Sequence, residues 1–329
     1  MRIGRTIDLA GRFAAHLPAW LLARGTRSLG HRREYGREIA RQALAPSDLH
    51  TLWKRRAPVV LTGFLDHFEL SRLLQPEIMK RAWGVTRTVT YRAPRDQKAF
   101  LQERSRPVFM DYDRLVDRIF FEKDPRFRYY SRMGAHPGSL FELASCIPSK
   151  ELAHVAIWIG EEENITPFHF DTFHSFIGQT FGEKRVVLVP PEDGIHLRYR
   201  TLPFSRQANQ VGPCELPDDV RGLEAVDRRY SLARRFDVVL GPGDFLYIPP
   251  GWWHWVVALT PNVSVLLRQH AAKREALRTP ETLHYVWREL LGEIGLAPAA
   301  SAPAWDETEV WSANEIRRLQ AAEAELEAR

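Results

Sequence analysis

Two short segments that lie far apart in this 329-residue chain restrict its fold more than any other feature. Residues 166–171 read Thr-Pro-Phe-His-Phe-Asp, and residues 243–254 read Gly-Asp-Phe-Leu-Tyr-Ile-Pro-Pro-Gly-Trp-Trp-His. On a strand, His169 and Asp171 leave the same face, because side chains there repeat every two residues. His254 follows a β-type run that ends in a turn. Two imidazoles and a carboxylate on one face of a metal leave its opposite face open. We therefore predict that His169, Asp171 and His254 form a metal site.

Further strands are expected around these two segments. Runs rich in apolar, aromatic or β-branched residues occur at 57–64, 129–131 and 154–159. Most of the remaining strands are expected between 165 and 270. Several short strands separated by turn signals favour a sandwich or a barrel. The sequence therefore predicts a mainly β fold with flanking helices.

Lys184 begins an apolar strand thirteen residues after Asp171. A lysine that points into a barrel is costly unless an anion pairs with it. We therefore expect either an anionic ligand beside Lys184 or a surface position on the turn that precedes the strand.

The residues that flank these positions carry a resemblance to a known family. The segments 164–171, 182–191 and 241–254 resemble those of the cupin-type JmjC hydroxylases, whose members include the asparaginyl hydroxylase that inhibits hypoxia-inducible factor. The similarity is clearest from about residue 57 to residue 269. It implies a double-stranded β-helix (a cupin or jelly-roll core) with helices packed outside.

The resemblance also implies the cofactor and the cosubstrates. Family members use Fe(II), 2-oxoglutarate and O₂, so the metal expected at the triad is Fe(II). By resemblance, Lys184 binds the distal carboxylate of 2-oxoglutarate and Thr166 assists it. A tyrosine from an earlier strand completes that pocket in the family. Tyr130 is favoured over Tyr129, although a slip of one residue in register would exchange the two.

The chain departs from the family pattern at two positions. Ser175 stands where the relative has an amide residue, four residues after the Asp ligand. The second amide contact of the family has no clear counterpart near residues 266–269. The inner cosubstrate contacts are therefore expected to differ. Aromatic rings near the motifs are expected mostly in the core, with Trp158 and Phe168 as candidates to narrow the cavity.

Composition divides the chain into three parts: a basic helical segment at 1–45, the catalytic domain at 46–272 and a helical segment at 273–329. The first 56 residues hold twelve Lys and Arg against four Asp and Glu. Such an end can attract nucleic acid or an anionic membrane. A solvated helix face is the favoured interpretation, so nucleic acid is not expected as a partner.

An apolar stripe in the C-terminal segment predicts an interface. It consists of Leu283, Val286, Trp287, Leu290, Leu291 and Ile294. A contiguous exposed patch of this kind usually marks a contact surface. The stripe either covers the barrel of its own chain or joins two copies. The resemblance favours a homodimer formed through C-terminal helices.

The chain has no apolar run of about 18 residues or more, which excludes a membrane-spanning helix. Its two cysteines, Cys146 and Cys214, do not make a disulfide framework and fit a reducing compartment. No secretory signal is evident in the N-terminal region. A cytoplasmic protein is therefore expected.

These features predict a 2-oxoglutarate-dependent Fe(II) oxygenase that hydroxylates a peptide or protein side chain. A small metabolite or natural-product intermediate is the alternative substrate. Demethylation of methyl-lysine is less favoured, because the chain lacks the cysteines of an accompanying zinc finger. A non-catalytic JmjC-like interaction protein is the remaining alternative, although such a module has no need of the triad and Lys184.

Overall fold

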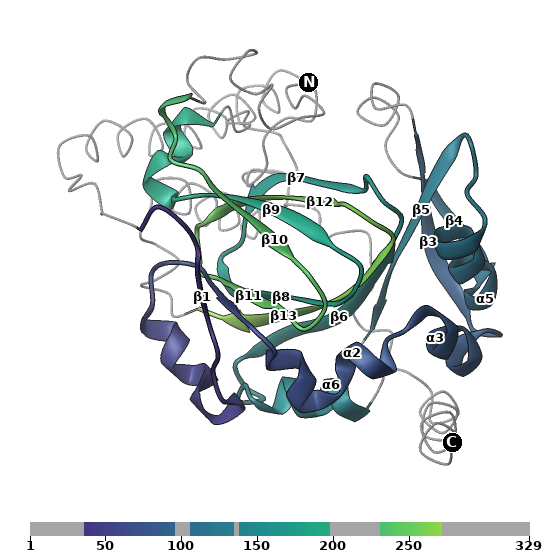
Figure 1. Cartoon of the computed structure of the whole chain (residues 1–329), viewed down its shortest axis with the longest axis horizontal. Coiled ribbons are helices and arrows are strands. Elements are labelled where there is room, and N and C mark those ends of the chain that lie inside the picture. The colour runs from purple at the N-terminus through teal and green to yellow at the C-terminus, as the bar shows by residue number, and fades with distance from the viewer. Residues whose placement is uncertain (1–35, 96–105, 135–137, 198–230, 272–329) are drawn as a thin grey trace, which may run out of the picture.

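The structure, a computed structural model, describes residues 36–95, 106–134, 138–197 and 231–271. Within these residues the strands form two sheets that face each other across a barrel (Figure 1). Almost all neighbouring strands are antiparallel, and only the β1–β2 pair is parallel. The predicted mainly β fold with a jelly-roll core is confirmed.

The major sheet has nine strands in the order β1-β2-β11-β8-β13-β6-β5-β3-β4. In chain order they are β1 (Ala40–Gln42), β2 (Val59–Leu61), β3 (Arg87–Pro94), β4 (Arg106–Asp111), β5 (Phe127–Gly134), β6 (Leu152–Gly160), β8 (Phe173–Phe181), β11 (Phe245–Ile248) and β13 (Asn262–His270).

The minor sheet has four strands in the order β10-β9-β12-β7. They are β7 (Ile165–Phe170), β9 (Lys184–Val189), β10 (Phe236–Leu240) and β12 (Trp253–Ala258). Both halves of the predicted metal motif lie in this sheet, because β7 carries His169 and β12 carries His254.

Short helices cover the outer face of the major sheet (Figure 1). They are η1 (Pro46–Lys54), η2 (Phe64–Phe68), α2 (Leu70–Leu73), α3 (Pro76–Trp83), α5 (Tyr112–Val116), η3 (Asp117–Phe121) and α6 (Gly138–Ser145). A further short helix, η4 (Pro191–His196), lies by the minor sheet. No helix among the described elements is long and apolar enough to cross a membrane.

Apolar side chains fill three layers. The outer face of the major sheet packs on the helices, with the stacked rings of Phe64 and Phe245 near its centre. Between the two sheets, Val186 and Leu188 of β9 pack with Leu246 of β11. The outer face of the minor sheet forms a third cluster: Phe168, Phe170, Val187, Val189, Leu197, Ala233, Trp253 and Trp255. Alternate residues of β7, β9 and β12 therefore face the barrel interior.

The N-terminal prediction is wrong where the structure tests it. Residues 40–42 of the segment predicted as helical form strand β1, which pairs with residues 59–61 of β2. Backbone pairing at a sheet edge outweighs the helical spacing of apolar residues, which is clearest before residue 18. Residues 1–35, most of the polar stretch between the motif halves and the C-terminal stripe lie outside the described residues. The proposed domain boundaries stay predictions.

Two connections that cross between the sheets touch each other. The β8–β9 turn contains Gly182, with φ at +70°, and the β12–β13 turn contains Pro261. A Cβ on Gly182 would lie 2.2 Å from the Pro261 carbonyl oxygen. The Glu183 backbone N–H also donates to Thr260 Oγ1 at 2.9 Å. These contacts set the direction in which β9 enters the minor sheet, beginning at Lys184.

We predict that Gly182→Ala lowers the free energy of unfolding by at least about 1 kcal/mol, because it combines a positive φ with a backbone clash. Gly241→Ala is the matched control, since a Cβ there meets nothing within 4 Å. The control should stay within about 0.5 kcal/mol of wild type in urea denaturation. Equal stability of Gly182→Ala and wild type would contradict this account of the turn.

Candidate active site

The structure brings His169, Asp171 and His254 together on the inner face of the minor sheet. His169 lies directly opposite His254 in the β7–β12 register, and their ring centroids are 4.0 Å apart. Asp171 follows the end of β7, and its Oδ2 lies 4.0 Å from His254 Nε2. One ligand atom from each residue lies within 4.8 Å of the others. We call this group the triad.

A backbone hydrogen bond sets the tautomer of His254. Its Nδ1 lies 3.1 Å from the carbonyl oxygen of Trp252. A carbonyl can only accept, so Nδ1 must donate and the lone pair of Nε2 is left free for a metal. Burial lowers the pKa of His254, and the neighbouring His169 lowers it further. The imidazole is therefore neutral, as metal ligation requires.

Asp171 is held as an ionised carboxylate. Ser175 Oγ donates to its Oδ2 at 2.7 Å, and Arg268 Nη2 lies 3.3 Å from the same oxygen. Burial alone would raise the pKa of Asp171, but Arg268, the two imidazoles and Ser175 outweigh burial and lower it. The Gly251 backbone N–H also donates to the Asp171 carbonyl oxygen at 2.8 Å. This bond ties the two halves of the motif together.

The triad fits a divalent metal by its donor chemistry. Two ligand atoms about 2.1 Å from one ion can be at most about 4.2 Å apart. The observed spread is close to that limit, so small side-chain rotations suffice to close the site. Two imidazoles and one carboxylate leave the remaining positions of the ion open, as in non-haem iron oxygenases.

Lys184 lies on the same inner face, farther along the sheet. Its neighbours in register are Ala258 of β12 and Leu240 of β10, and Leu240 packs between the sheets. Burial lowers the pKa of Lys184 to about 8. Within the described part of the chain, the side chain of Lys184 makes no hydrogen bond or ion pair, although its backbone pairs in the sheet. A partly buried cation of this kind fits an anionic ligand.

Thr166 occupies the interval between the triad and Lys184. Its partner in register is Val256, which packs in the inner core. Along β12 the order is therefore His254 at the triad, Val256 opposite Thr166, and Ala258 opposite Lys184. The four steps along the strand from His254 to Ala258 span about 13 Å. A lysine side chain and a dicarboxylate as long as 2-oxoglutarate can bridge that distance.

The two candidate tyrosines lie on opposite faces of β5. Tyr129 packs in the outer cluster under the helices, and its hydroxyl donates to Asp124 Oδ2 at 3.3 Å. Tyr130 stacks on Trp158, with ring centroids 6.5 Å apart. Because neighbouring residues of a strand alternate, Tyr130 lies on the inner face. The geometry favours Tyr130 for the cosubstrate pocket, and its role stays a prediction.

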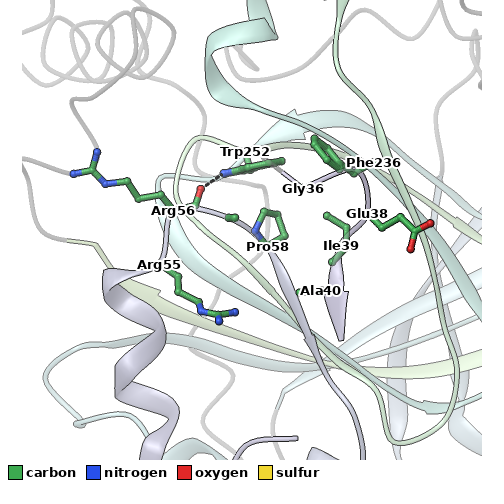
Figure 2. A pocket seen from close by; sticks show the side chains of 10 residues that line it. Gly36, Glu38, Ile39, Ala40, Arg55, Arg56, Pro58, Phe236 and Trp252 are labelled. Carbon is green, nitrogen blue, oxygen red and sulfur yellow. Dashed lines mark hydrogen bonds between the residues drawn. The ribbon is translucent and has the colours of Figure 1, made fainter. Parts of the chain in front are cut away.

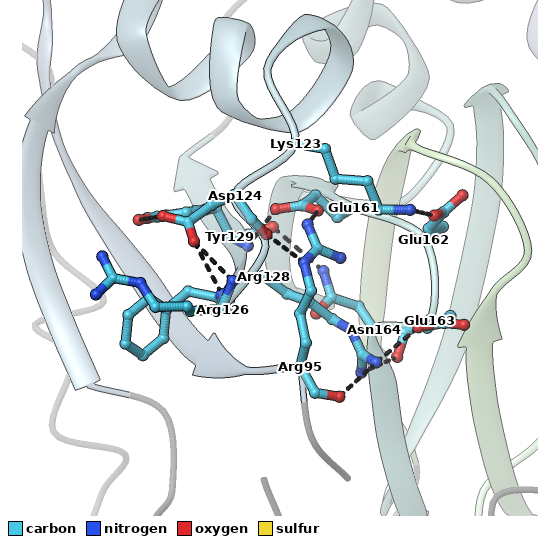
Figure 3. Close-up of polar contacts among 11 residues, drawn as sticks. Arg95, Lys123, Asp124, Arg126, Arg128, Tyr129, Glu161, Glu162, Glu163 and Asn164 are labelled. Atoms are coloured by element: carbon cyan, nitrogen blue, oxygen red, sulfur yellow. Dashed lines mark hydrogen bonds and ion pairs between the residues drawn. The ribbon is translucent and has the colours of Figure 1, made fainter. Parts of the chain in front are cut away.

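A polar network fixes this register (Figure 3). The Tyr129 backbone N–H donates to Glu161 Oε1 at 2.8 Å, and Glu161 is also paired with Arg95. Arg128 Nη1 donates to the Glu163 carbonyl oxygen at 3.0 Å, and its Nη2 contacts the Glu163 carboxylate at 2.6 Å. The network joins the start of β5 to the β6–β7 turn. It thereby fixes the start of β7 relative to β5.

Arg268 was missed by the sequence analysis. It lies on β13 of the major sheet, opposite Ser175 of β8 and His154 of β6. The family pattern has an amide near residues 266–269, and in the sequence an arginine there appears as an ordinary strand residue. The contact of Arg268 with Asp171 across the barrel is evident only once the strands are placed in three dimensions.

The predictions for the aromatic residues agree with the structure in part. Trp252, Trp253 and Trp255 are all buried in core clusters, as expected. Trp158 is partly buried beside Tyr130. Phe168 does not narrow the cavity, because it packs in the outer cluster of the minor sheet. Alternation along β7 explains this result, since its neighbour His169 faces inward.

A separate pocket of about 290 Å³ opens beside β1 and the start of β10 (Figure 2). Apolar side chains such as Ile39, Phe236 and Trp252 line it, together with Arg55 and Arg56. Neither the triad nor Lys184 lines this pocket. We therefore do not assign it to the chemistry of the triad.

Comparison with known proteins agrees with this geometry. The family model of the Cupin-like domain matches residues 47–267, so the chain belongs to that family. A Jumonji C domain-containing protein 5 of Drosophila melanogaster is 32% identical over 111 residues, covering 34% of this chain and 26% of the relative. The predicted resemblance to the JmjC family is confirmed.

Two further relatives show the range of names in this family. Lysine-specific demethylase JMJ30 of Arabidopsis thaliana is 30% identical over 131 residues, covering 36% of this chain and 28% of the relative. A tRNA wybutosine-synthesizing protein 5 of Danio rerio is 38% identical over 97 residues, covering 30% and 27%. These matches span less than a third of the relatives, and they support an oxygenase-type enzyme of the JmjC and cupin class.

We predict that His154 is neutral at neutral pH. Burial lowers its pKa to about 4, and the positive charges of Arg132 and Arg268 add to the effect. An NMR titration of the imidazole should show no protonation between pH 7 and about 5. Arg132→Met should raise the midpoint by removing one of the two charges. A wild-type midpoint near the ordinary value of about 6.5 would contradict the placement of His154.

Proposed function

We propose that this protein is an Fe(II)- and 2-oxoglutarate-dependent oxygenase that hydroxylates a C–H bond of a peptide or protein side chain. The observation that carries the proposal is the alignment of the triad, Thr166 and Lys184 along one inner face. That face offers a metal site at one end and, at the other, a partly buried cation whose side chain has no partner among the residues that the structure describes. A binding module would gain nothing from this arrangement.

Each described residue has a definite part in the proposal. His169, Asp171 and His254 hold the metal, and the Trp252 carbonyl orients His254. Lys184 and Thr166 hold the distal carboxylate of 2-oxoglutarate, with Tyr130 beside them. When bound, iron with 2-oxoglutarate and O₂ would supply the oxidation that turns C–H into C–OH, releasing succinate and CO₂. The two packed sheets limit the access of water to these groups.

The same inner face also bears on the alternative substrates. A small metabolite remains the alternative, because nothing in the triad distinguishes it from a peptide. Methyl-lysine, a cationic substrate, is disfavoured by the guanidinium of Arg268, which lies 3.3 Å from Asp171 in the triad. We further propose a cytoplasmic location and a homodimer formed through the C-terminal segment, both from the sequence alone.

The enzyme proposal predicts succinate formation that depends on Fe(II), O₂ and 2-oxoglutarate. Anaerobic titration should show one Fe(II) per chain, because the triad offers one site in the described residues. The double variant His169→Ala/His254→Ala should lose both Fe(II) and turnover. His50→Ala, an exposed histidine outside the triad, is the matched control and should keep both.

Two results would contradict the proposal. Unchanged iron stoichiometry in the folded double variant would remove the triad as the metal site. Absence of succinate from iron-loaded wild type, also in the presence of a peptide panel, would favour the interaction-protein alternative.

The cosubstrate assignment predicts a pH-dependent affinity. Lys184 is charged below pH 8 and loses its charge above it, because burial lowers its pKa to about 8. The affinity for 2-oxoglutarate should therefore fall above pH 8, by up to about tenfold per pH unit. Lys184→Met removes a charge-assisted contact of about 1.5–3 kcal/mol and should bind 2-oxoglutarate at least about tenfold more weakly, without this pH dependence.

Lys80→Met provides the control for that experiment. Lys80 pairs with Asp117 on the helical side of the molecule, so its loss should leave the affinity and its pH profile unchanged. Equilibrium binding of 2-oxoglutarate to anaerobic protein between pH 7 and 9.5 gives the readout. Equal affinity of wild type and Lys184→Met at pH 7 would show that the pocket is assigned to the wrong residue.

A further inference from the structure

Asn164 joins the two sheets at the end of the barrel that carries Lys184. It precedes β7 and comes two residues before Thr166. The Ala258 backbone N–H of β12 donates to the Asn164 carbonyl oxygen at 3.0 Å, and Ala258 lies opposite Lys184 of β9. The side chain of Asn164 turns the other way, and its Nδ2 donates to the Tyr129 carbonyl oxygen of β5 at 3.3 Å (Figure 3). One residue therefore contacts the strands on both sides of the proposed cosubstrate pocket.

Gly160, the last residue of β6, leaves the space in which the Asn164 amide lies. Gly160 is opposite Tyr130 in the β5–β6 register. Its neighbour Ile159 packs in the core under the helices, so position 160 faces the barrel interior. A Cβ on Gly160 would lie 2.7 Å from Asn164 Nδ2 and 3.1 Å from Tyr130 Cβ. An alanine there would therefore displace the Asn164 amide and press on the base of the Tyr130 side chain.

Two donors fix the peptide unit that leads into Tyr130. Besides the Asn164 amide, the Glu161 backbone N–H donates to the Tyr129 carbonyl oxygen at 3.1 Å. A carbonyl oxygen has two lone pairs, so both of its acceptor positions are used. This carbonyl belongs to a rigid, planar peptide unit whose other end is the backbone nitrogen of Tyr130. The two hydrogen bonds therefore set the direction in which the Tyr130 side chain leaves the sheet.

Neighbouring rings hold the Tyr130 ring from its two sides. The Tyr91 ring stacks on it from β3 with centroids 5.2 Å apart, and the Trp158 ring stacks from β6 at 6.5 Å. Such stacking restricts rotation of the ring, but it does not set the place of the ring along β5. That place depends on the backbone of Tyr130, and hence on the Asn164 amide.

We propose that Asn164 is a positioning residue, which sets the Tyr130 hydroxyl against the distal carboxylate of 2-oxoglutarate, and that Gly160 provides the space for its amide. This inference rests on the proposed function and adds the residue that orients the tyrosine of the cosubstrate pocket. Loss of the amide would leave the Tyr129 carbonyl with one of its two donors and open a space beside Tyr130. A hydrogen bond weakens steeply as its distance and angle depart from the optimum, so a small shift of Tyr130 weakens its contact with the carboxylate.

The test compares 2-oxoglutarate with 2-oxopentanoate, which has a methyl group in place of the distal carboxylate. The full chain is loaded with Zn(II) in place of Fe(II), and ligand-observed NMR gives both dissociation constants. Their ratio measures the contacts of the distal carboxylate alone. Wild type should bind 2-oxoglutarate at least about tenfold more tightly than 2-oxopentanoate. Asn164→Ala and Gly160→Ala should each reduce this preference to about threefold or less, while the affinity for 2-oxopentanoate stays within about twofold of wild type.

Two further variants separate positioning from a general loss of stability. Tyr130→Phe should lower the preference in the same way, and adding Asn164→Ala to it should change the preference by less than about twofold, because both act on one contact. Ser131→Ala is the matched control. The Ser131 hydroxyl donates to the Val89 carbonyl oxygen at 2.8 Å and is buried on the opposite face of β5. The control loses a comparable side chain–backbone hydrogen bond beside Tyr130 and should keep the full preference.

Full preference in both Asn164→Ala and Gly160→Ala would overturn the inference, and so would an equal loss in the Ser131→Ala control. A further loss on adding Asn164→Ala to Tyr130→Phe would also overturn it, because the amide would then act on the cosubstrate without Tyr130. Wild type that binds neither oxo acid would contradict the proposed function and this inference together. Wild type that prefers 2-oxoglutarate, with both variants keeping that preference, would contradict this inference alone.

Discussion

The antiparallel pairing of β7 with β12 is the contact on which the rest of the site depends. It sets His169 opposite His254, and the Gly251–Asp171 backbone hydrogen bond closes the same pair of strands at its end. Strand pairing brings the three donors together although 85 residues separate His169 from His254. A shift of one residue would turn one imidazole toward the outer cluster and remove the site.

The charged groups of the site are arranged along the direction of these two paired strands. The minor sheet supplies the donors of the triad and, about 13 Å farther along the strand, the backbone position of Lys184. The major sheet supplies Arg268, which meets Asp171 from the opposite side. The burial that separates these groups from water also lowers the pKa of Lys184 and of His254. One geometry therefore accounts both for a neutral metal ligand and for a cation that needs an anionic partner.

Much of this could be predicted from the sequence, because the decisive signals are local. The two-residue period of His169 and Asp171, the turn before His254 and the apolar run after Lys184 are each readable within about ten residues. Contacts across the barrel cannot be predicted from such local patterns. Arg268 is one polar residue among several in an apolar strand, and its contact with Asp171 depends on the register of β13 with β8. Strand β1 was missed for the same reason, since its pairing partner β2 is remote in sequence.

The most direct test of the account is an anaerobic crystal structure of the protein with Fe(II) and 2-oxoglutarate. The account predicts anomalous iron density about 2.0–2.2 Å from one atom each of His169, Asp171 and His254. It also predicts the distal carboxylate of 2-oxoglutarate against Lys184 and Thr166. Iron bound elsewhere, or 2-oxoglutarate with its distal carboxylate on Arg268, would contradict it.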